Sequence, residues 1–425
     1  MKSRLNQEDM KKLEFLYNSN QFIELETETK NLIKKHSNVA NLYNILGFAL
    51  QKQGKLNLAI SSLKKAISID PKFAIAYNNL GNAFKDIKKY KKAFSYYQKS
   101  IEIKPDYAEA HYNQACLFRE TFHYNEAIEK YNQAIKYNPN YAEAYNNLGY
   151  VLRHVGKLEA AIENYQKAIK YKPNFAEAYS NIFFTLFYMD EENQDYYISL
   201  AKKFRSYLKP IDNKLLLETK FDKNPNKLKI GFISGDFKQH PVAFFLLNAL
   251  KHLKNKKLEL IAYSNSKEID EFSIQLKSLF FNWNEIADQD DIKVINQIRN
   301  DGIHILIDLS GHSSMNRLPV FISKPAPIQV TWAGYAGSTG IPEIDYLIGD
   351  SFVTPQNESS HFTEKIFRLP NIWVSFTPPN ISIEIDQLPA IKNGYITFGC
   401  FNNLSKINDK VIFLWSRILK SIPKS

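Results

Sequence analysis

The sequence contains few cysteines and no long apolar segment. Its two cysteines, Cys116 and Cys400, lie far apart in a chain of 425 residues. Such a pair indicates a reducing compartment rather than a disulfide framework. Residues 1–9 contain no apolar core of a signal peptide, and the apolar run at 182–189 is too short to cross a bilayer. These absences predict a soluble, cytoplasmic protein with no membrane partner.

A compact basic tract is also absent, although the net charge is +11. The lysines are spread along the chain, as expected for solvated helix faces, so we predict no nucleic-acid partner. Apolar residues make up 44% and charged residues 23% of the sequence, which are ordinary values for globular proteins. A chain of this length is expected to form two to three domains, each with its own core.

A 34-residue repeat occupies the first part of the sequence. Three independent columns keep this step: a small residue at Gly47, Gly81, Ala115 and Gly149, a proline at Pro71, Pro105, Pro139 and Pro173, and an alanine at Ala59, Ala93, Ala127 and Ala161. The period is that of tetratricopeptide repeats, in which a small residue lies where two helices touch and a proline ends the second helix. We therefore predict a repeat superhelix over residues 1–190, with about five repeats, a degenerate first unit and a concave groove.

The first helices of these repeats also carry a column of asparagines. Asn79, Asn113, Asn147 and Asn181 follow one another at the same 34-residue step. A ladder of carboxamides can donate to and accept from a peptide main chain without recognising its side chains. The alternative is that asparagine is merely an acceptable polar residue on a solvated helix face.

After a linker at 191–226, apolar strands alternate with helices. Strands are predicted at 227–234, 258–263, 304–309, 328–332 and 345–348, with helices near 242–253, 271–279 and 292–300. This alternation indicates a mostly parallel, doubly wound α/β lobe over 227–390. A strand at 394–401 and a helix at 409–422 predict the beginning of a second α/β lobe at 391–425, which would need more βα units to cover its sheet.

Polar residues gather around two of the predicted strands. The stretch 301–350 includes Asp301 and His304, and ligands of open α/β sheets bind beyond the carboxyl ends of strands, so we expect a pocket there. His240 precedes Pro241 at the start of a helix, where free N–H groups favour an anion. A lone histidine at such a turn is more often structural, and His304 favours the catalytic alternative. The glycine-rich turn at 334–340 could approach a phosphate or sugar, but it has no dinucleotide fingerprint.

Several motifs, in this order, resemble those of the O-linked N-acetylglucosamine transferases, including their bacterial and Spindly-like members. After the repeats come IGFISGDF…HP at 230–241, DGIHIL at 301–306, PAPIQ…W…GY…GSTG at 325–340 and FNNLSKI at 401–407. The resemblance extends over nearly the whole chain in the domain order of the family.

The resemblance implies an inverting, metal-independent, cofactor-free GT-B glycosyltransferase. It would move N-acetylglucosamine from UDP-GlcNAc to serine or threonine hydroxyls of proteins held by the repeats. The motifs place His240 and His304 in a cleft between two lobes, Asp301 near proton removal, and Asn403 and Lys406 at the nucleotide-sugar donor. An ammonium there would offset the charge of the leaving diphosphate, and a histidine can deprotonate a hydroxyl. Which group is the base stays open.

The remaining donor contacts of that family would follow residue 425. We therefore expect weak or absent transfer by this chain, as a fragment of a longer protein or as a degenerate transferase. Two other functions stay open: a non-catalytic repeat scaffold that binds protein partners, and a related transferase that uses another donor such as GDP-fucose or UDP-glucose.

Overall fold

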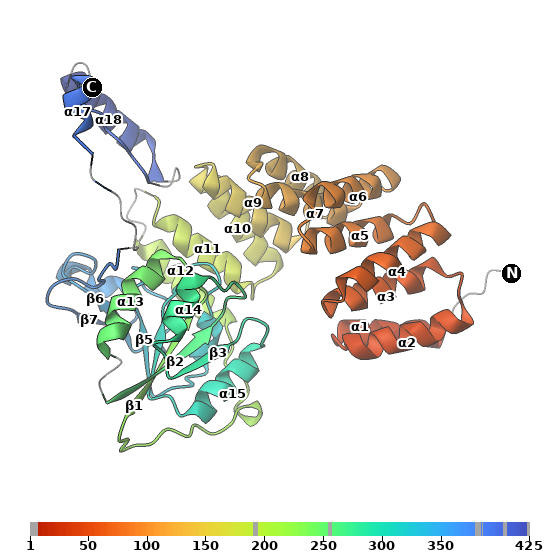
Figure 1. Cartoon of the computed structure of the whole chain (residues 1–425), viewed down its shortest axis with the longest axis horizontal. Helices are drawn as coiled ribbons and strands as arrows, with labels where there is room; N and C mark the ends of the chain where they lie inside the picture. Colours follow the sequence, from red (N-terminus) through yellow and green to blue (C-terminus); the bar gives the residue numbers. More distant parts are fainter. Residues whose placement is uncertain are drawn as a thin grey trace. The chain divides into compact units, whose positions relative to one another are not determined.

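The chain divides into two compact units, Met1–Tyr171 and Lys172–Ser425. The computed structural model describes residues 7–189, 194–253, 257–378, 384, 386–402 and 406–422. Figure 1 shows paired helices in the first unit and a strand-and-helix fold in the second. Each unit is described separately below. None of the helices in these described ranges combines the length and apolarity needed to cross a membrane.

The first unit is a stack of antiparallel helix pairs. Its helices are α1 (Gln7–Asn18), α2 (Phe22–Lys35), α3 (Ala40–Lys52), α4 (Leu56–Ile69), α5 (Ala74–Asp86), α6 (Tyr90–Ile103), α7 (Ala108–Glu120), α8 (Tyr124–Tyr137), α9 (Ala142–His154) and α10 (Leu158–Tyr171). Each predicted proline follows the C-terminal cap of a second helix; Pro71, for example, comes after Asp70 at the end of α4. The predicted tetratricopeptide architecture is therefore confirmed.

The glycine column marks the contact between the two helices of a pair. A Cβ atom at Gly81 would lie 2.5 Å from the ring of Tyr97, and one at Gly149 would lie 2.7 Å from the ring of Tyr165. Both tyrosines are completely buried. Because only a hydrogen fits between the helices at these positions, the recurring small residue follows directly from the packing.

The second unit contains a parallel sheet of seven strands in the order β3-β2-β1-β4-β5-β6-β7. The strands are β1 (Leu228–Ser234), β2 (Leu258–Ser264), β3 (Asn282–Glu285), β4 (Ile305–Asp308), β5 (Ile328–Thr331), β6 (Tyr346–Gly349) and β7 (Lys365–Arg368). The helices around them are α11 (Ala176–Leu186), α12 (Gln194–Tyr207), α13 (Pro241–Leu253), α14 (Glu271–Lys277), α15 (Asp291–Asp301) and α16 (Leu318–Ile322). Its core includes Leu246 and Leu250 of α13, packed with Phe232 of β1 and Leu260 of β2. The predicted doubly wound α/β lobe is confirmed.

The boundary between the units differs from the predicted one at residue 190. Helix α11 belongs to the second unit, and α12 lies within the predicted linker. The reason is packing: Phe183 of α11 is fully buried with its ring 4.2 Å from that of His312, and Arg205 of α12 forms an ion pair with Glu343. The two helices thus cover part of the α/β lobe.

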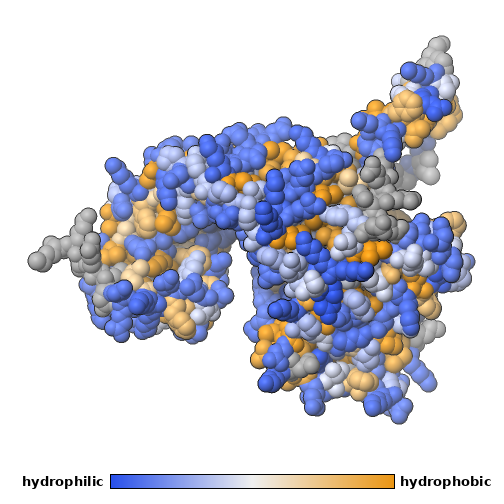
Figure 2. Space-filling model, turned by 180° about the vertical axis from the view of Figure 1, so that it is seen from behind, coloured by the Kyte–Doolittle hydropathy of each residue, from blue (hydrophilic) through white to orange (hydrophobic). Residues whose placement is uncertain are grey.

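The described residues 386–402 and 406–422 of the C-terminal segment form helix α17 (Pro389–Asn393) and one further helix but no strand. Helix α18 (Asp409–Ser421) forms as predicted, and the side chain of Asn408 caps it by accepting a hydrogen bond from Val411 N–H at 2.9 Å. The strand predicted at 394–401 does not form, since a strand needs a neighbour for its ladder and no described residue pairs with it. Apolar side chains of α18 such as Phe413 and Trp415 are exposed, and Figure 2 shows an apolar patch on this segment.

Candidate functional site

The C-terminal edge of the sheet carries the loops that follow β1, β4 and β5. Ligands of parallel sheets bind at this edge, where the strand order allows loops to separate. Asp308, the last residue of β4, shapes the second of these loops by accepting hydrogen bonds from Ser310 N–H at 3.1 Å, Gly311 N–H at 2.8 Å and the Thr331 hydroxyl at 2.8 Å. Burial raises the pKa of Asp308 to about 6. The loop after β4 is therefore held in place by hydrogen bonds to Asp308.

His240 lies in the loop after β1, immediately before α13. Its side chain is 38% exposed, and Nδ1 lies 3.7 Å from Oδ2 of Asp236. Burial raises the pKa of Asp236, while His240 and Lys238 oppose that rise. Among the residues that the structure describes, the ring takes part in one hydrogen bond, a long one of 3.4 Å from Val242 N–H to Nδ1. A half-exposed imidazole beside a carboxylate can take up a proton from a substrate hydroxyl.

His304 lies at the opposite edge of the sheet. It precedes β4, and its backbone N–H donates to the carbonyl of Lys229 near the start of β1. Its ring accepts from Lys229 N–H at Nδ1 over 3.0 Å, and Nε2 donates to the carbonyl of Asp222 over 2.8 Å. The edges are separated by the length of β1, roughly 20 Å at about 3.3 Å per residue. The prediction that His240 and His304 line one cleft is corrected accordingly.

Asp301 lies with His304 at this N-terminal edge. It is the last residue of α15, and its Oδ2 accepts a hydrogen bond of 2.6 Å from the Tyr263 hydroxyl. Burial raises the pKa of Asp301. Its predicted place beside a reacting hydroxyl is therefore corrected too. The sequence contained a signal for this arrangement, because Gly302, with φ of +68°, is a typical residue at a helix C-terminus. A helix that ends at Gly302 puts His304 before the strand and not after it.

His312 lies at the C-terminal edge, in the loop after β4, and the sequence analysis did not single it out. It is only 2% exposed. Its Nε2 donates to the Thr339 carbonyl at 2.9 Å, and Nδ1 lies 3.1 Å from the Ser180 hydroxyl of α11. Burial lowers its pKa to about 3. It is thus a neutral cross-link between two loops and α11.

The glycine-rich turn at 334–340 is held by bonds within the protein. A Cβ atom at Gly334 would lie 1.9 Å from the Leu309 carbonyl oxygen, so glycine is required for the close approach of two loops. Glu364 accepts the N–H of Thr339 at 2.8 Å and the hydroxyl of Ser338 at 2.8 Å. These two donors are therefore used within the protein, and the requirement for glycine at position 334 is explained by packing.

The predicted donor contacts are described only in part. Lys406 is exposed and precedes α18, whereas Asn403 lies outside the described residues. Within the described ranges, no group of three or more His, Cys, Asp or Glu side chains could hold a metal ion.

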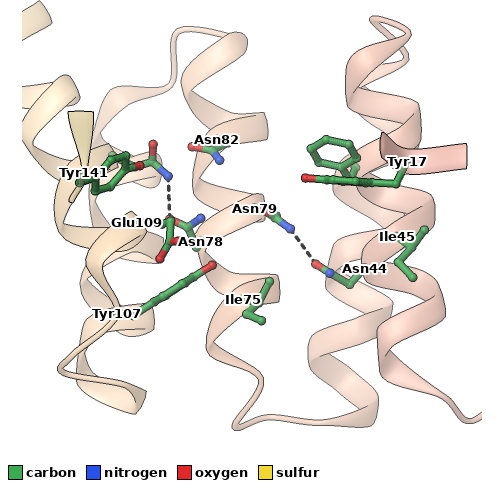
Figure 3. A pocket seen from close by; sticks show the side chains of 12 residues that line it. Tyr17, Asn44, Ile45, Ile75, Asn78, Asn79, Asn82, Tyr107, Glu109 and Tyr141 are labelled. Carbon is green, nitrogen blue, oxygen red and sulfur yellow. Dashed lines mark hydrogen bonds between the residues drawn. The ribbon is translucent and has the colours of Figure 1, made fainter. Parts of the chain in front are cut away.

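The predicted asparagine ladder joins neighbouring repeats. Asn79 Nδ2 donates to Asn44 Oδ1 at 2.9 Å, and Asn113 Nδ2 donates to Asn78 Oδ1 at 2.9 Å (Figure 3). Further along, Asn147 Nδ2 donates to the Tyr112 hydroxyl at 2.9 Å. Asn181 belongs to α11 of the second unit. Each of the three bonds spans 35 residues, so the ladder has a structural role in the stack.

A groove of about 370 Å³ lies against this ladder. Asn79, Asn113 and Asn82 line it, together with aromatic side chains such as Tyr107 and the carboxylate of Glu109. Figure 3 shows Tyr107, Glu109 and the asparagines facing the same space. The groove thus offers carboxamides, phenols and one acid to an extended ligand.

Comparison with known proteins agrees with this architecture. Residues 212–376 match the model of glycosyl transferase family 41, and residues 47–88, 74–107, 123–154 and 142–175 match tetratricopeptide repeat models. The chain is a tetratricopeptide-repeat protein in which residues 212–376 are similar to glycosyl transferase family 41. The predicted resemblance to the O-linked N-acetylglucosamine transferases is confirmed.

Relatives of this glycosyltransferase-domain protein occur in plants and animals. A probable UDP-N-acetylglucosamine–peptide N-acetylglucosaminyltransferase, SPINDLY of Hordeum vulgare, is 39% identical over 202 residues, which are 47% of this chain and 21% of the relative. The UDP-N-acetylglucosamine–peptide N-acetylglucosaminyltransferase of Caenorhabditis elegans is 32% identical over 155 residues, 35% of this chain and 13% of its own. The match thus spans about a fifth of the barley protein's length.

A solved structure extends the similarity to 82% of this chain. A mutant of the Thermobaculum terrenum O-GlcNAc transferase superposes with a TM-score of 0.72 at 29% identity, covering 82% of this chain and 66% of that chain. The fold, repeats followed by an α/β lobe of GT-B type, is therefore shared.

Proposed function

We propose that this protein is an inverting glycosyltransferase that moves N-acetylglucosamine from UDP-GlcNAc to serine or threonine residues of proteins held by its repeats. The observation that carries the proposal is one chain in which a family 41 domain follows repeats with an asparagine-lined groove. The printed names of the barley and nematode relatives, which describe transfer of N-acetylglucosamine to peptides, support the donor and the acceptor class.

The acceptor peptide would lie in the groove of the first unit. Asn79 and Asn113 each use one N–H on the neighbouring repeat. The second N–H and the carbonyl oxygen of each carboxamide can then pair with a peptide bond. Main-chain pairing of this kind holds many sequences, which suits an enzyme that modifies different proteins.

Transfer itself is proposed to use the C-terminal edge of the sheet. His240 would orient the acceptor hydroxyl and accept its proton, with Asp236 stabilising the imidazolium that forms. The start of α13 lies directly behind it, and the positive end of that helix dipole would favour the negatively charged donor. Lys406 and Asn403 would contact the departing diphosphate, so its charge is offset by an ammonium without a metal or cofactor. Asp301 and His304 are assigned no part in this step.

A labelled-donor assay tests this function. The purified chain is incubated with radiolabelled UDP-GlcNAc, UDP-glucose or GDP-fucose and a mixture of cytoplasmic proteins. We expect slow transfer from UDP-GlcNAc that His240→Ala abolishes. His252→Ala is the matched control, because His252 is also exposed but lies at the far end of α13. Transfer from another donor would change the proposed substrate, and equal label with and without His240 would contradict the proposed chemistry.

One observation favours a second function, a non-catalytic scaffold that captures proteins. All residues that line the asparagine groove belong to the first unit, so peptide capture needs no residue of the α/β lobe. In that case peptides would bind through Asn79 and Asn113 while no donor is consumed. A cytoplasmic location is proposed for either function, supported by two free cysteines, Cys116 and Cys400.

A further inference from the structure

Arg119, near the end of α7, has a guanidinium group without a polar partner. It is partly buried, and among the described residues no hydrogen bond or ion pair reaches its side chain. Four arginines of the α/β lobe differ from Arg119. Arg205, Arg299, Arg317 and Arg368 each donate hydrogen bonds to carboxylates, carbonyls or hydroxyls. Since partial burial removes water from a cation, a missing counter-charge at Arg119 is unusual and needs a reason.

Aromatic groups surround this guanidinium. The Arg119 group lies 5.5 Å from the centroid of the Tyr150 ring, and Arg153 lies 5.2 Å from the same centroid. No carboxylate is among the titratable groups that influence the pKa of Arg119, which are Tyr131, Cys116, Tyr112 and Tyr150. Burial raises the pKa of Tyr112 and Tyr131, so these phenols stay neutral at pH 7. Two guanidinium groups thus share one aromatic ring.

The repeat geometry puts this cluster on the groove side of the stack. Tyr150 belongs to a column with Phe48, Asn82 and Cys116 at 34-residue steps. Phe48 and Asn82 of this column line the groove, and Figure 3 labels Asn82. Residues at the same position of successive repeats face the same way. The side chain of Tyr150, with a guanidinium near it from Arg119, therefore continues the groove surface beyond the cavity lined by Asn82.

We propose that Arg119, supported by Tyr150 and Arg153, binds an anionic side chain of the acceptor peptide. A guanidinium presents two parallel N–H donors that match the two oxygens of a carboxylate or phosphate, and a ring face keeps that fork in place. The asparagine ladder would hold the main chain, and this subsite would select peptides with an acid at one register. The inference rests on the proposed capture of peptides in the groove.

Matched peptides test the subsite. One glutamate is moved step by step through a fluorescent host peptide of roughly 15 residues, long enough to follow several repeats when extended. Each glutamate peptide has a glutamine twin and a phosphoserine twin, and binding to the full chain is measured by fluorescence anisotropy. At one register we expect an anionic peptide to bind about fivefold to tenfold more tightly than its glutamine twin. That ratio should fall below about twofold in Arg119→Met.

Variants separate a specific contact from general attraction by a basic protein. Arg417→Met is the matched control, since Arg417 is exposed and also lies near a ring, 6.0 Å from Phe413, and it should keep the wild-type ratio. Arg119→Lys keeps the positive charge but has no pair of parallel N–H donors, so it should give an intermediate ratio. This second variant keeps the test valid if Arg119→Met folds poorly. An unchanged ratio in both Arg119 variants would overturn the inference.

The proposed function can fail independently of this subsite. If Asn79→Ala with Asn113→Ala leaves the affinity of glutamate and glutamine peptides unchanged, main-chain capture in the groove is wrong. If that double variant weakens both peptides equally while Arg119→Met changes neither, capture stands and the anionic subsite does not. Preference for glutamate or for phosphoserine identifies which anion the subsite takes.

Discussion

The two edges of the parallel sheet use histidine in opposite ways. At the N-terminal edge His304 is 9% exposed, and both ring nitrogens are hydrogen-bonded to the main chain of Lys229 and Asp222. At the C-terminal edge His240 is half-exposed and has Asp236 3.7 Å away. The His304 ring is a cross-link with no nitrogen left for a substrate, whereas the half-exposed His240 ring is the one to which we assign proton transfer in the proposed function. In a parallel sheet, a residue that precedes a strand and a residue that follows one lie at opposite edges. His304 precedes β4 and His240 follows β1, so their places in the sheet, and not the motifs that contain them, separate the two histidines.

The largest effect should come from His304→Ala. The change leaves Lys229 N–H and the Asp222 carbonyl without their partner, and each such loss costs about 1–3 kcal/mol where water is excluded. We expect the free energy of unfolding to fall by about 3 kcal/mol, measured by urea denaturation. His304→Gln retains one acceptor and one donor and should lose less. If the free energy of unfolding of His304→Ala falls by less than about 1 kcal/mol, the structural role assigned to His304 is wrong.

His312 should make stability depend on pH. Its pKa is about 3 in the folded protein against the ordinary 6.5, so the unfolded chain binds more protons between these values. The free energy of unfolding therefore falls as the pH drops below 6.5, by about 2 kcal/mol between pH 7 and pH 5. Asp308, with a folded pKa of about 6, acts in the opposite direction below that pH. Wild type and a His312→Asn variant both contain Asp308. The difference between their free energies of unfolding therefore reports the contribution of His312 alone.

The measurement compares urea denaturation of wild type and His312→Asn at pH 7 and pH 5. The variant loses the Thr339 contact and should be less stable at pH 7, but the gap should narrow by about 2 kcal/mol at pH 5. Parallel pH curves would show that His312 is not held neutral.

A smaller effect is expected for Asp301→Asn. The amide oxygen still accepts the Tyr263 hydroxyl, and the substitution removes a carboxylate whose pKa burial already raises. We expect the free energy of unfolding to change by less than about 1 kcal/mol. Thermal melting followed by circular dichroism measures it, with Tyr263→Phe as the control that deletes the same bond from the other side. A change above about 2 kcal/mol would indicate a larger role for the charge.

The smallest change in stability should belong to His240→Ala. Its ring is half-exposed and its contacts are long, so the free energy of unfolding should change by less than about 0.5 kcal/mol. The same melting experiment measures it beside His304→Ala. A strong destabilisation would make the two edges alike and would leave no histidine for proton transfer.

The repeats were largely predictable because their contacts are local and recur. Gly81 and Gly149 meet Tyr97 and Tyr165 in the same way one pair after another, so one period describes both packing and sequence. Helix α11 shows the limit of this reasoning. It keeps the repeat pattern, but its buried Phe183 packs against the α/β lobe, a contact that no period reports.

The α/β lobe was predictable in its elements but only in part at its site. Alternating strands and helices indicated a parallel sheet, whereas strand order and the edge reached by each residue depend on contacts distant in sequence. Only the family resemblance assigns His304 and Asp301 to the cleft, whereas a strand that begins at or just after His304 puts both residues at the N-terminal edge of the sheet. The expected strand at 394–401 needed a neighbour that local pattern does not supply.

The hydrogen bonds of the asparagine ladder would couple the proposed binding of a peptide to the stiffness of the repeat stack. Asn79 and Asn113 hold consecutive repeats together through the same carboxamides that face the groove. A peptide that pairs with the remaining N–H and carbonyl groups of these side chains would therefore contact the junctions between consecutive repeats. A bound peptide would restrain the movement of each repeat relative to the next and so fix the pitch of the superhelix. Without a peptide, this movement would be less restrained.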